Sequence, residues 1–288
     1  MSDTLTAAAP DRAVAAPSLP PGRALRLGIR RTGFEVKQYF RTLDQVFFTF
    51  LFPTVLFVIF GSAFSAMDVT APDGSTLTQA AYFLPGMVAA GLLLSGLQNM
   101  AIEIAIEKSD GTLKRLGGSP LPKLSYFIGK MGQILVTSLL QLALLLLVAR
   151  FAFAVELPTE LSAWLTFAWV YLLGLVTSTV LGIALSAVPR SGKSASAVVI
   201  PIVLILQFIS GVYLAFHFLP EWLQNIASVF PLKWMAQGMR AVFLPESFAG
   251  LEMSGSWELP LVALILGVWA VAGLVLTALT FRWIRKDS

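Results

Sequence analysis

Long apolar stretches separated by short polar ones dominate the pattern of this chain. Six stretches contain no Asp, Glu, Lys or Arg, and they cover residues 45–67, 74–102, 131–149, 161–189, 194–220 and 259–281. A helix needs about 20 residues to cross about 30 Å of hydrocarbon. Barrel strands would instead alternate over about 10 residues, a pattern that residues 139–148 lack. We predict an all-α integral membrane protein with six transmembrane helices within residues 45–288.

The composition supports a lipid environment and removes several kinds of site. Only 12% of the residues are charged and 57% are hydrophobic, whereas an average soluble domain has roughly 25% charged residues. The chain has no cysteine, and His217 is its single histidine. Because clustered Cys or His ligands are lacking, we expect no metal site.

The basic residues predict the orientation. With the N-terminus in the cytoplasm, 17 of the 20 Lys and Arg residues lie on the cytoplasmic side, and Arg150, Lys233 and Arg240 remain outside. Cytoplasmic loops of membrane proteins carry such an excess of positive charge. We therefore expect both termini in the cytoplasm.

Two different segments precede the first apolar stretch. Residues 1–22 are rich in Ala, Pro and Ser and have no apolar run, so we predict a disordered cytoplasmic tail. Residues 23–44 alternate bases with Leu25, Ile29, Val36 and other apolar residues near helical spacing. This pattern predicts an amphipathic helix in the inner headgroup layer, where its bases attract anionic lipid.

The loop at residues 103–130 predicts a short helix that contacts another protein. Glu103 and Glu107 are four residues apart at the membrane boundary, and Gly111 can end their helix. Leu113 and Leu116 then share one face of a short helix, beside Lys114 and Arg115 in the sequence. We expect the apolar face to dock into a groove on a partner protein, and Lys130 to mark the return into the membrane.

A second segment, residues 216–247, is apolar but too interrupted to cross a membrane. Its prolines divide it into two short helices, the second beginning after Pro231. Trp222 and Trp234 are suited to the outer membrane interface. We predict a re-entrant helical hairpin that closes the outer mouth of a pathway, with Trp222, Pro231, Lys233 and Arg240 as gate residues. The alternative is an external lid that has no role in transport.

Uncharged polar residues within the apolar stretches are candidates for a substrate path. The candidates are Gln98, Asn99, Gln133, Gln141 and Gln207. The alternative is that their side chains form hydrogen bonds between helices and do not line a path. Because no acid or base lies centrally in any stretch, a proton-coupled carrier is disfavoured.

Three regions together resemble the permease subunits of type-2 ABC exporters, the bacterial drug, polysaccharide and lipid efflux family. They are the loop residues Glu107, Gly111, Thr112, Leu113, Arg115, Leu116, Pro120, Gly129 and Lys130, the N-terminal Tyr39–Phe40–Arg41 with Phe52–Pro53, and the later Leu219–Trp222, Phe230–Leu232 and Arg240. The resemblance extends over about residues 23–286. The chain departs from the family pattern directly before Gly111-Thr112-Leu113. The family often has further charged residues there, whereas this chain has Lys108-Ser109-Asp110.

The resemblance implies a function and partners. A separate P-loop ATPase, expected in two copies, would bind ATP and Mg²⁺. This chain would bind no cofactor, would have no catalytic residues of its own and would lie in a bacterial cytoplasmic membrane. The residues implied for contact with the ATPase are Glu107, Gly111, Thr112, Leu113, Lys114, Arg115 and Leu116. A second permease copy or a paralogue would complete the pathway within the lipid, and nucleic acid is not an expected partner. The cargo would be an amphipathic small molecule, drug, lipid or lipid-linked glycan.

Two other classes of function remain open at this point. A secondary carrier or channel should show internal repeats and broken helices, and no convincing repeat of the two halves is present. A membrane-embedded lipid-modifying enzyme would need a cluster of reactive groups at the interface. Its nearest candidates are Glu103 and Glu107.

Overall fold

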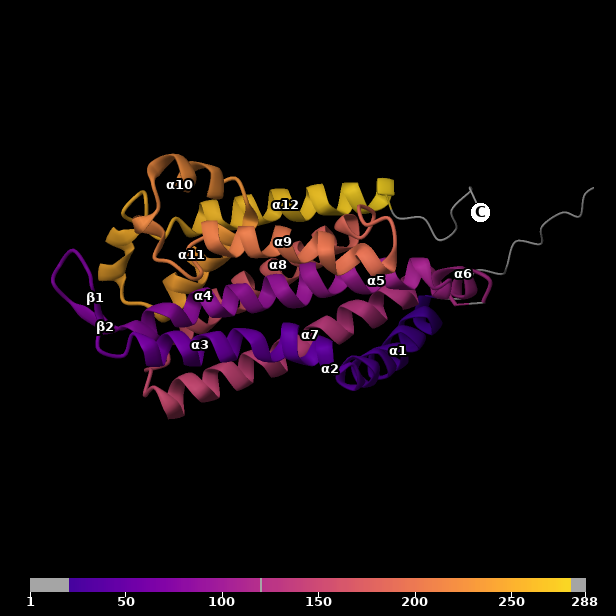
Figure 1. Cartoon of the computed structure of the whole chain (residues 1–288), viewed down its shortest axis with the longest axis horizontal. Coiled ribbons are helices and arrows are strands. Elements are labelled where there is room, and N and C mark those ends of the chain that lie inside the picture. The colour runs from indigo at the N-terminus through magenta and orange to yellow at the C-terminus, as the bar shows by residue number, and fades with distance from the viewer. Residues whose placement is uncertain (1–20, 120, 281–288) are drawn as a thin grey trace, which may run out of the picture.

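Six long helices form one bundle in the computed structural model, which describes residues 21–119 and 121–280. The helices long and apolar enough to cross a membrane are Leu43–Ala63, Gln79–Ser109, Leu124–Ala152, Leu161–Leu185, Gly192–Ile209 and Leu259–Thr280. They run along the long axis of the molecule (Figure 1). The predicted all-α membrane fold is thereby confirmed, and the predicted tail at residues 1–22 lies almost entirely outside the described residues.

The first two spanning helices each contain a π-helical turn. The first consists of α2 (Leu43–Gln45), the turn Val46–Leu51 and α3 (Phe52–Ala63). The second consists of α4 (Gln79–Leu93), the turn Leu94–Asn99 and α5 (Met100–Ser109). π-helical turns inside α-helices are rare and are found frequently at functional sites.

The remaining spanning helices are α7 (Lys123–Ala152), α8 (Leu161–Leu185), α9 (Gly192–Ile209) and α12 (Leu259–Thr280). Gln79–Ser109 lies at the centre of the bundle, since 94% of its apolar window is buried, compared with 22% for Gly192–Ile209 and for Leu259–Thr280. The peripheral helices expose apolar side chains that only lipid or another apolar surface can cover.

A small β-hairpin precedes the second spanning helix. β1 (Asp68–Thr70) pairs antiparallel with β2 (Thr76–Thr78), with Val69 opposite Leu77. Gly74 adopts a left-handed φ of 86° in the turn. Thr78 then caps α4 by accepting a hydrogen bond from the Ala81 backbone N–H. The second helix therefore begins at Gln79 rather than at residue 74.

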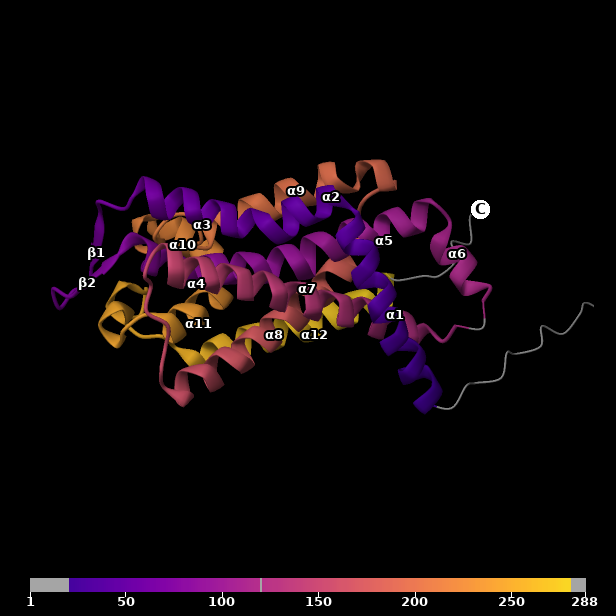
Figure 2. The same cartoon turned by 90° about the horizontal axis from the view of Figure 1, so that it is seen from below.

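Short elements close this end of the bundle, which we call the hairpin end. They are the 3₁₀ turn Phe216–Phe218, α10 (Glu221–Ala227), α11 (Pro231–Phe243) and the 3₁₀ turn Glu246–Leu251. α11 lies inside the bundle beside α4, α8 and α12 (Figures 1 and 2). Two short helices, α10 and α11, do occur within residues 216–247, and the second begins at Pro231; their re-entrant placement in a membrane stays a prediction.

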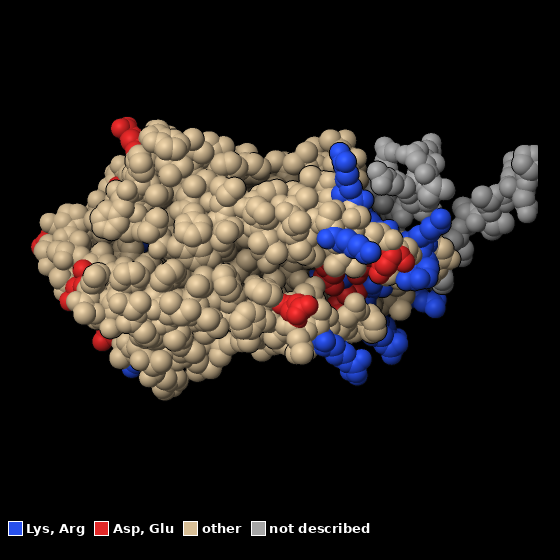
Figure 3. All heavy atoms as spheres, viewed as in Figure 1, with Lys and Arg blue, Asp and Glu red and all other residues tan. Residues whose placement is uncertain are grey.

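The opposite end, which we call the basic end, carries α1 (Pro21–Arg41), α6 (Thr112–Gly117) and most of the described Lys and Arg side chains (Figure 3). α1 crosses the bundle obliquely and packs against α7 (Figure 2). α1 ends at Arg41, three residues before the predicted boundary, because Thr42 adopts an extended conformation with φ −98° and ψ 92°.

Candidate functional site

α6 is set off from α5 by a sharp turn at Gly111. The φ of Gly111 is 78°, a conformation that side chains with a Cβ rarely adopt. The Asp110 carboxylate accepts a hydrogen bond from the Thr112 backbone N–H at 2.8 Å, and Arg115 donates to the Thr112 hydroxyl at 3.1 Å. The turn and its cap hold α6 at the tip of the α5–α7 connection.

The apolar face of α6 packs into its own chain. Leu113 is 2% exposed and belongs to the main apolar core, and the partly buried Leu116 packs against that core. The exposed residues of α6 include Lys114 and Arg115. Leu113 therefore packs into this chain and not against a partner protein, because the bundle itself offers it an apolar surface. Leu116 keeps part of its surface exposed, so its contact with a partner stays a prediction. The face of α6 that a partner can reach is basic.

A buried charge cluster lies where α1, α5 and α7 meet, and Lys130 is at its centre. The Nζ atom of Lys130 lies 2.7 Å from Glu103 Oε1, 2.6 Å from Glu107 Oε1 and 2.9 Å from Glu35 Oε2. The Lys130 side chain has no exposed surface. Lys130 lies about two turns into α7, so this helix begins before the predicted point of return into the membrane, and the position of that boundary stays a prediction. Glu107 belongs to α5, not to the short helix.

Two further groups complete this cluster. Arg31 pairs with Glu35 at 2.7 Å within α1, and its guanidinium lies 5.1 Å from the ring centre of Tyr126. The Tyr126 hydroxyl donates to Glu107 Oε2 at 2.7 Å. Three carboxylates therefore face two cations, and Glu103 Oε2 is buried without a hydrogen-bond partner among the described residues.

The three carboxylates are close enough together to suggest a cation site. The candidate ligand atoms of Glu35, Glu103 and Glu107 lie within 4.8 Å of one another. Lys130 contacts all three carboxylates, so its ammonium group occupies the place that a bound cation would need. The arrangement is an ion-pair network that joins three helices.

Close backbone contacts hold α1 against α7 around this cluster. A Cβ atom on Gly28 would lie 2.6 Å from Ile128, and one on Gly129 would lie 2.7 Å from the stem of Arg31. The Ser125 hydroxyl donates to the Ala24 carbonyl at 2.8 Å. Larger residues at either glycine would force the helices apart, so the cluster depends on this approach.

The other end of α1 is attached to the first spanning helix. The Tyr39 and Thr49 hydroxyls lie 2.6 Å apart, and Thr49 also lies 2.6 Å from the Gln45 carbonyl, to which it donates. Tyr39 is therefore the donor to Thr49. Burial raises the pKa of Tyr39 to about 12, which keeps this donor protonated.

The candidate substrate-path residues are buried inside this single chain. Asn99 accepts a hydrogen bond from Gln45, Gln141 accepts one from Ser95, and Gln207 accepts one from Tyr213. Gln98 is also buried, and both amide atoms of Gln133 are buried without partners among the described residues. The bonds found are interhelical or local packing bonds, and a role in a path stays a prediction.

The candidate gate residues have different environments at the hairpin end. Trp222 is 64% exposed, whereas Lys233 and Arg240 are buried in α11, which begins at Pro231 itself. Lys233 donates to Gln237, and Arg240 pairs with Glu252 at 2.5 Å. These internal partners explain why two bases occur on the side of the molecule that is otherwise poor in them.

Trp234 and His217 are two further residues of the hairpin end that the sequence singled out. Trp234 is 5% exposed and donates to the Ser228 carbonyl at 2.7 Å, so its ring packs inside the chain and has little surface left for lipid headgroups. His217 is partly buried against Phe218, with its Nδ1 atom unpartnered among the described residues. Burial lowers the pKa of His217, so it is neutral at pH 7.

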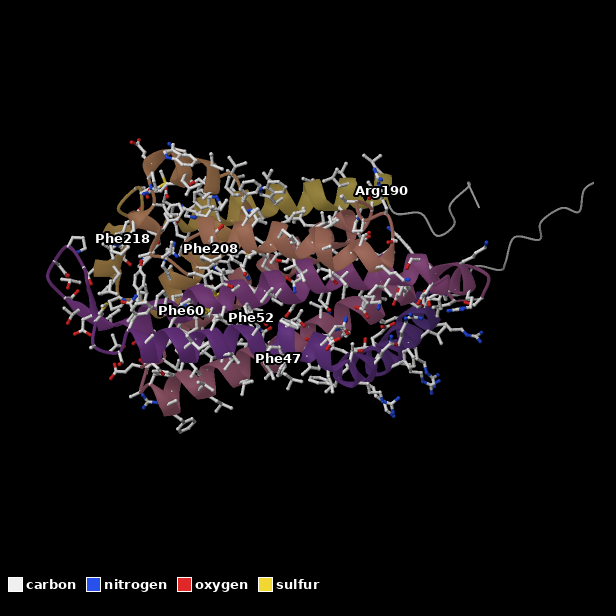
Figure 4. The ribbon with its side chains drawn as sticks, in the orientation of Figure 1. Phe47, Phe52, Phe60, Arg190, Phe208 and Phe218 are labelled. Atoms are coloured by element: carbon white, nitrogen blue, oxygen red, sulfur yellow. The ribbon has the colours of Figure 1, made fainter. Side chains whose placement is uncertain are left out.

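One side of the bundle carries a row of phenylalanines. Phe47, Phe52 and Phe60 come from the first spanning helix, and Phe208 and Phe218 come from α9 and the turn after it (Figure 4). Phe47, Phe208 and Phe218 are 48%, 47% and 77% exposed. This face is apolar, and the described residues do not cover it.

The chain belongs to the ABC-2 type transporter family, whose members' pattern it matches over residues 32–244. It is 22% identical over 191 residues to "Probable multidrug ABC transporter permease YbhR" of Escherichia coli K12, covering 66% of this chain and 51% of that protein. It is 26% identical over 193 residues to "Putative transport permease ycf38" of Porphyra purpurea, covering 66% and 65%. The chain thus spans about half to two thirds of these relatives. The family identifies it as the permease subunit of an ABC transporter.

The sequence interpretation missed the partners of Lys130. Glu35 is the single acid in a helix of many bases, and Lys130 is a charge close to the start of an apolar stretch. Each is a departure from its surroundings, and an acid that is isolated among bases can indicate a buried pair. Their pairing across 95 residues has no local signal.

Proposed function

We propose that the chain is the membrane subunit of an exporter driven by a separate P-loop ATPase that binds at the basic end. The ATPase would hydrolyse Mg-ATP, and two ATPase copies would act on two permease chains. The cargo would be an amphipathic small molecule, drug, lipid or lipid-linked glycan. The "multidrug" in the name of the bacterial relative is compatible with such a cargo.

The observation that carries this proposal is the charge cluster beside α6. α6 is connected directly to α5 and α7, and Lys130 binds carboxylates of α5 and α1. A force applied to α6 would therefore reach three helices through short, buried ion pairs. Buried charge networks of this kind resist being partly opened, because an uncompensated charge costs several kcal/mol. The network is suited to moving the helices as a unit.

The basic end fits the proposed cytoplasmic side of a bacterial membrane. Exposed bases of α1, α6 and the start of α9 lie at this end, and cytoplasmic segments are enriched in Lys and Arg. The exposed Lys114 and Arg115 would contact acidic groups of the ATPase. In this arrangement both termini lie in the cytoplasm.

The phenylalanine face is the proposed contact with a second permease chain, identical or paralogous. Phe47 and Phe208 expose about half of their surface on helices that only partly bury their apolar windows. Two such faces opposed would enclose an apolar route, which suits an amphipathic cargo. The substrate path would then lie between chains and not through the buried Gln residues of one chain.

The same geometry disfavours a lipid-modifying enzyme. Glu103 and Glu107, its nearest candidate residues, both bind Lys130, and Glu107 also accepts the Tyr126 hydroxyl. Carboxylates held in this way are structural counter-ions.

The test is purification of the tagged full chain from native membranes in mild detergent, with mass spectrometry of the co-purifying proteins. We compare the parent with K114E/R115E, which reverses the exposed face of α6 without touching Leu113. R150E, an exposed base at the hairpin end, is the control. A P-loop ATPase present with the parent and R150E but lost with K114E/R115E supports the proposal. An ATPase retained by K114E/R115E, or absent from every folded sample, overturns the proposed contact.

A further inference from the structure

α1 presents three distinct faces along its length. On a helical wheel of about 100° per residue, the buried residues Ala24, Gly28, Glu35 and Tyr39 fall within about 60° of one another. This face packs on α7 and the first spanning helix and carries the ion pair to Lys130. The rest of α1 is open in this chain.

The face opposite the bundle is a stripe of bases. Its residues, which fall within about 60° on the same wheel and are all exposed, are Arg23, Arg26, Arg30, Lys37 and Arg41. Among the described residues none of the five forms an ion pair, and the single acid of α1, Glu35, is on the buried face. We call these five residues the basic stripe.

An apolar strip adjoins the basic stripe. Leu25, Ile29 and Phe40 are 51%, 61% and 37% exposed and also fall within about 60° of one another. The exposed Leu43 and Phe47 follow at the start of the first spanning helix. A helix with an apolar strip beside a row of bases is built to lie at the boundary between hydrocarbon and headgroups.

We propose that the basic stripe binds the anionic headgroups of phospholipids in the leaflet next to the basic end. The stripe is complementary to anionic groups, since five cations face outward with no acid among them. The adjoining apolar strip distinguishes a lipid from a soluble acidic partner, because Leu25 and Ile29 would remain in water beside the latter. The inference rests on the proposed function only for the choice of the cytoplasmic leaflet.

Lipid bound to the stripe would act on the charge cluster through one helix. Arg31 and Glu35 lie between the stripe residues Arg30 and Lys37, and Glu35 contacts Lys130 at 2.9 Å. A headgroup that holds α1 in the interface therefore also holds one of the three carboxylates against Lys130. Anionic lipid should stabilise the purified chain more than neutral lipid does.

The test measures lipid binding by native mass spectrometry on the full chain, purified without any ATPase. Phosphatidylglycerol and phosphatidylcholine with the same acyl chains are titrated against the parent and R26Q/R30Q. R190Q/K193Q removes the same number of exposed charges from the turn before α9 and the first turn of α9, which also lie at the basic end but outside α1, and is the control. Each base near an anionic surface contributes about fivefold in affinity, so R26Q/R30Q should lose about 25-fold for phosphatidylglycerol.

The proposal further predicts rescue and salt dependence. R26K/R30K should keep the phosphatidylglycerol preference, and the preference should fall between 0.1 M and 1 M salt as the screening length shortens from about 10 Å to about 3 Å. The thermal unfolding midpoint of each variant shows whether it is folded. If R26Q/R30Q does not fold, K37Q replaces it, with an expected loss of about fivefold.

Several results would overturn the proposal. The first is equal binding of the two lipids, and the second is an equal loss in R190Q/K193Q. The third is displacement of phosphatidylglycerol by inorganic phosphate at the same concentration, which would show a simple anion site. Unchanged phosphatidylglycerol binding by R26Q/R30Q would also overturn the proposal, and loss of the ATPase by the same variant in the native-membrane purification would then assign the stripe to the ATPase contact. Because the lipid assay contains no ATPase, it can fail while the proposed function stands, and the reverse also holds.

Discussion

Two buried lysines at opposite ends of the bundle show two ways of holding a cation away from water. Lys130 contacts three carboxylates from two other helices. Lys233 contacts the amide oxygen of Gln237, with its Nζ atom 3.8 Å from the Trp234 ring centre and 5.4 Å from that of Phe216. The basic end therefore keeps a permanent charge network, whereas the hairpin end holds an ammonium group with weaker, neutral partners.

The hairpin end also contains a conventional ion pair, which sharpens the contrast. Arg240 and Glu252 each have 4% exposed side-chain surface and lie 2.5 Å apart. Burial opposes the charge on Arg240, but the attraction of Glu252 outweighs it, and the pKa of Arg240 is raised. The negative charge of Glu252 also acts on Lys233, but the Glu252 carboxylate forms its ion pair with Arg240.

Loss of Lys130 should have the largest effect. K130M would leave three carboxylates near one remaining cation, so we expect a loss of about 3–5 kcal/mol of stability, seen as a lower unfolding midpoint in detergent. K130R should retain much of the stability, because it keeps the charge. K193M, at an exposed position, should change it by less than about 0.5 kcal/mol. A K130M protein as stable as the parent would show that the network is not ionised as the distances imply.

The Arg240–Glu252 pair should come second. R240M or E252Q alone strands one buried charge, at a cost of about 2–4 kcal/mol, and the double variant should lose less than the sum. A double-variant cycle measured by unfolding in detergent gives the coupling, expected at about 1–3 kcal/mol. Strict additivity of the two losses would mean that the pair contributes no interaction energy of its own.

The carboxylates of the Lys130 network should not be equivalent. Glu107 uses both oxygens, one on Lys130 and one on Tyr126. Glu103 leaves one oxygen without a partner and is 13% exposed at its side chain. E107Q should cost about 1.5–3 kcal/mol, the range for hydrogen bonds to charged groups. E103Q, which removes the excess negative charge, should cost less than about 1 kcal/mol. Unfolding midpoints of the two matched variants decide this, and a larger loss for E103Q would reverse our assignment.

The spanning helices could be predicted because lipid imposes one rule on all of them. A backbone in hydrocarbon must satisfy its own hydrogen bonds, so about 20 apolar residues define a helix. The short helices around Pro231 and after Gly111 followed from prolines and glycines in the same way. The β-hairpin was missed because the Thr-rich residues 76–78 carry no charge and merge with the apolar run that follows.

The side-chain partners of these elements could not be predicted from local pattern. Leu113 and Leu116 have the spacing of an exposed docking face, and only the fold shows that this chain buries Leu113 and covers part of Leu116. Lys130 looks like a boundary charge until Glu35, 95 residues away, is placed beside it. Helical periodicity shows which residues share a face, but the surface that this face meets depends on tertiary packing.

Lys233 should give the smallest effect, and one that depends on pH. Burial lowers its pKa to about 8, although Glu252 and Glu258 partly oppose this shift. An unfolded lysine has a pKa of about 10.4, so between these values the unfolded chain binds more protons than the folded one, and stability rises with pH. From pH 7.5 to pH 9 the gain should be about 1 kcal/mol. The measurement is the difference in unfolding midpoint between the parent and K233M at the two pH values, which cancels the titration of other groups. K233M should be relatively more stable at pH 7.5 than at pH 9. A difference that does not change with pH would show that Lys233 is compensated as fully as Lys130, and the contrast between the two ends would then fail.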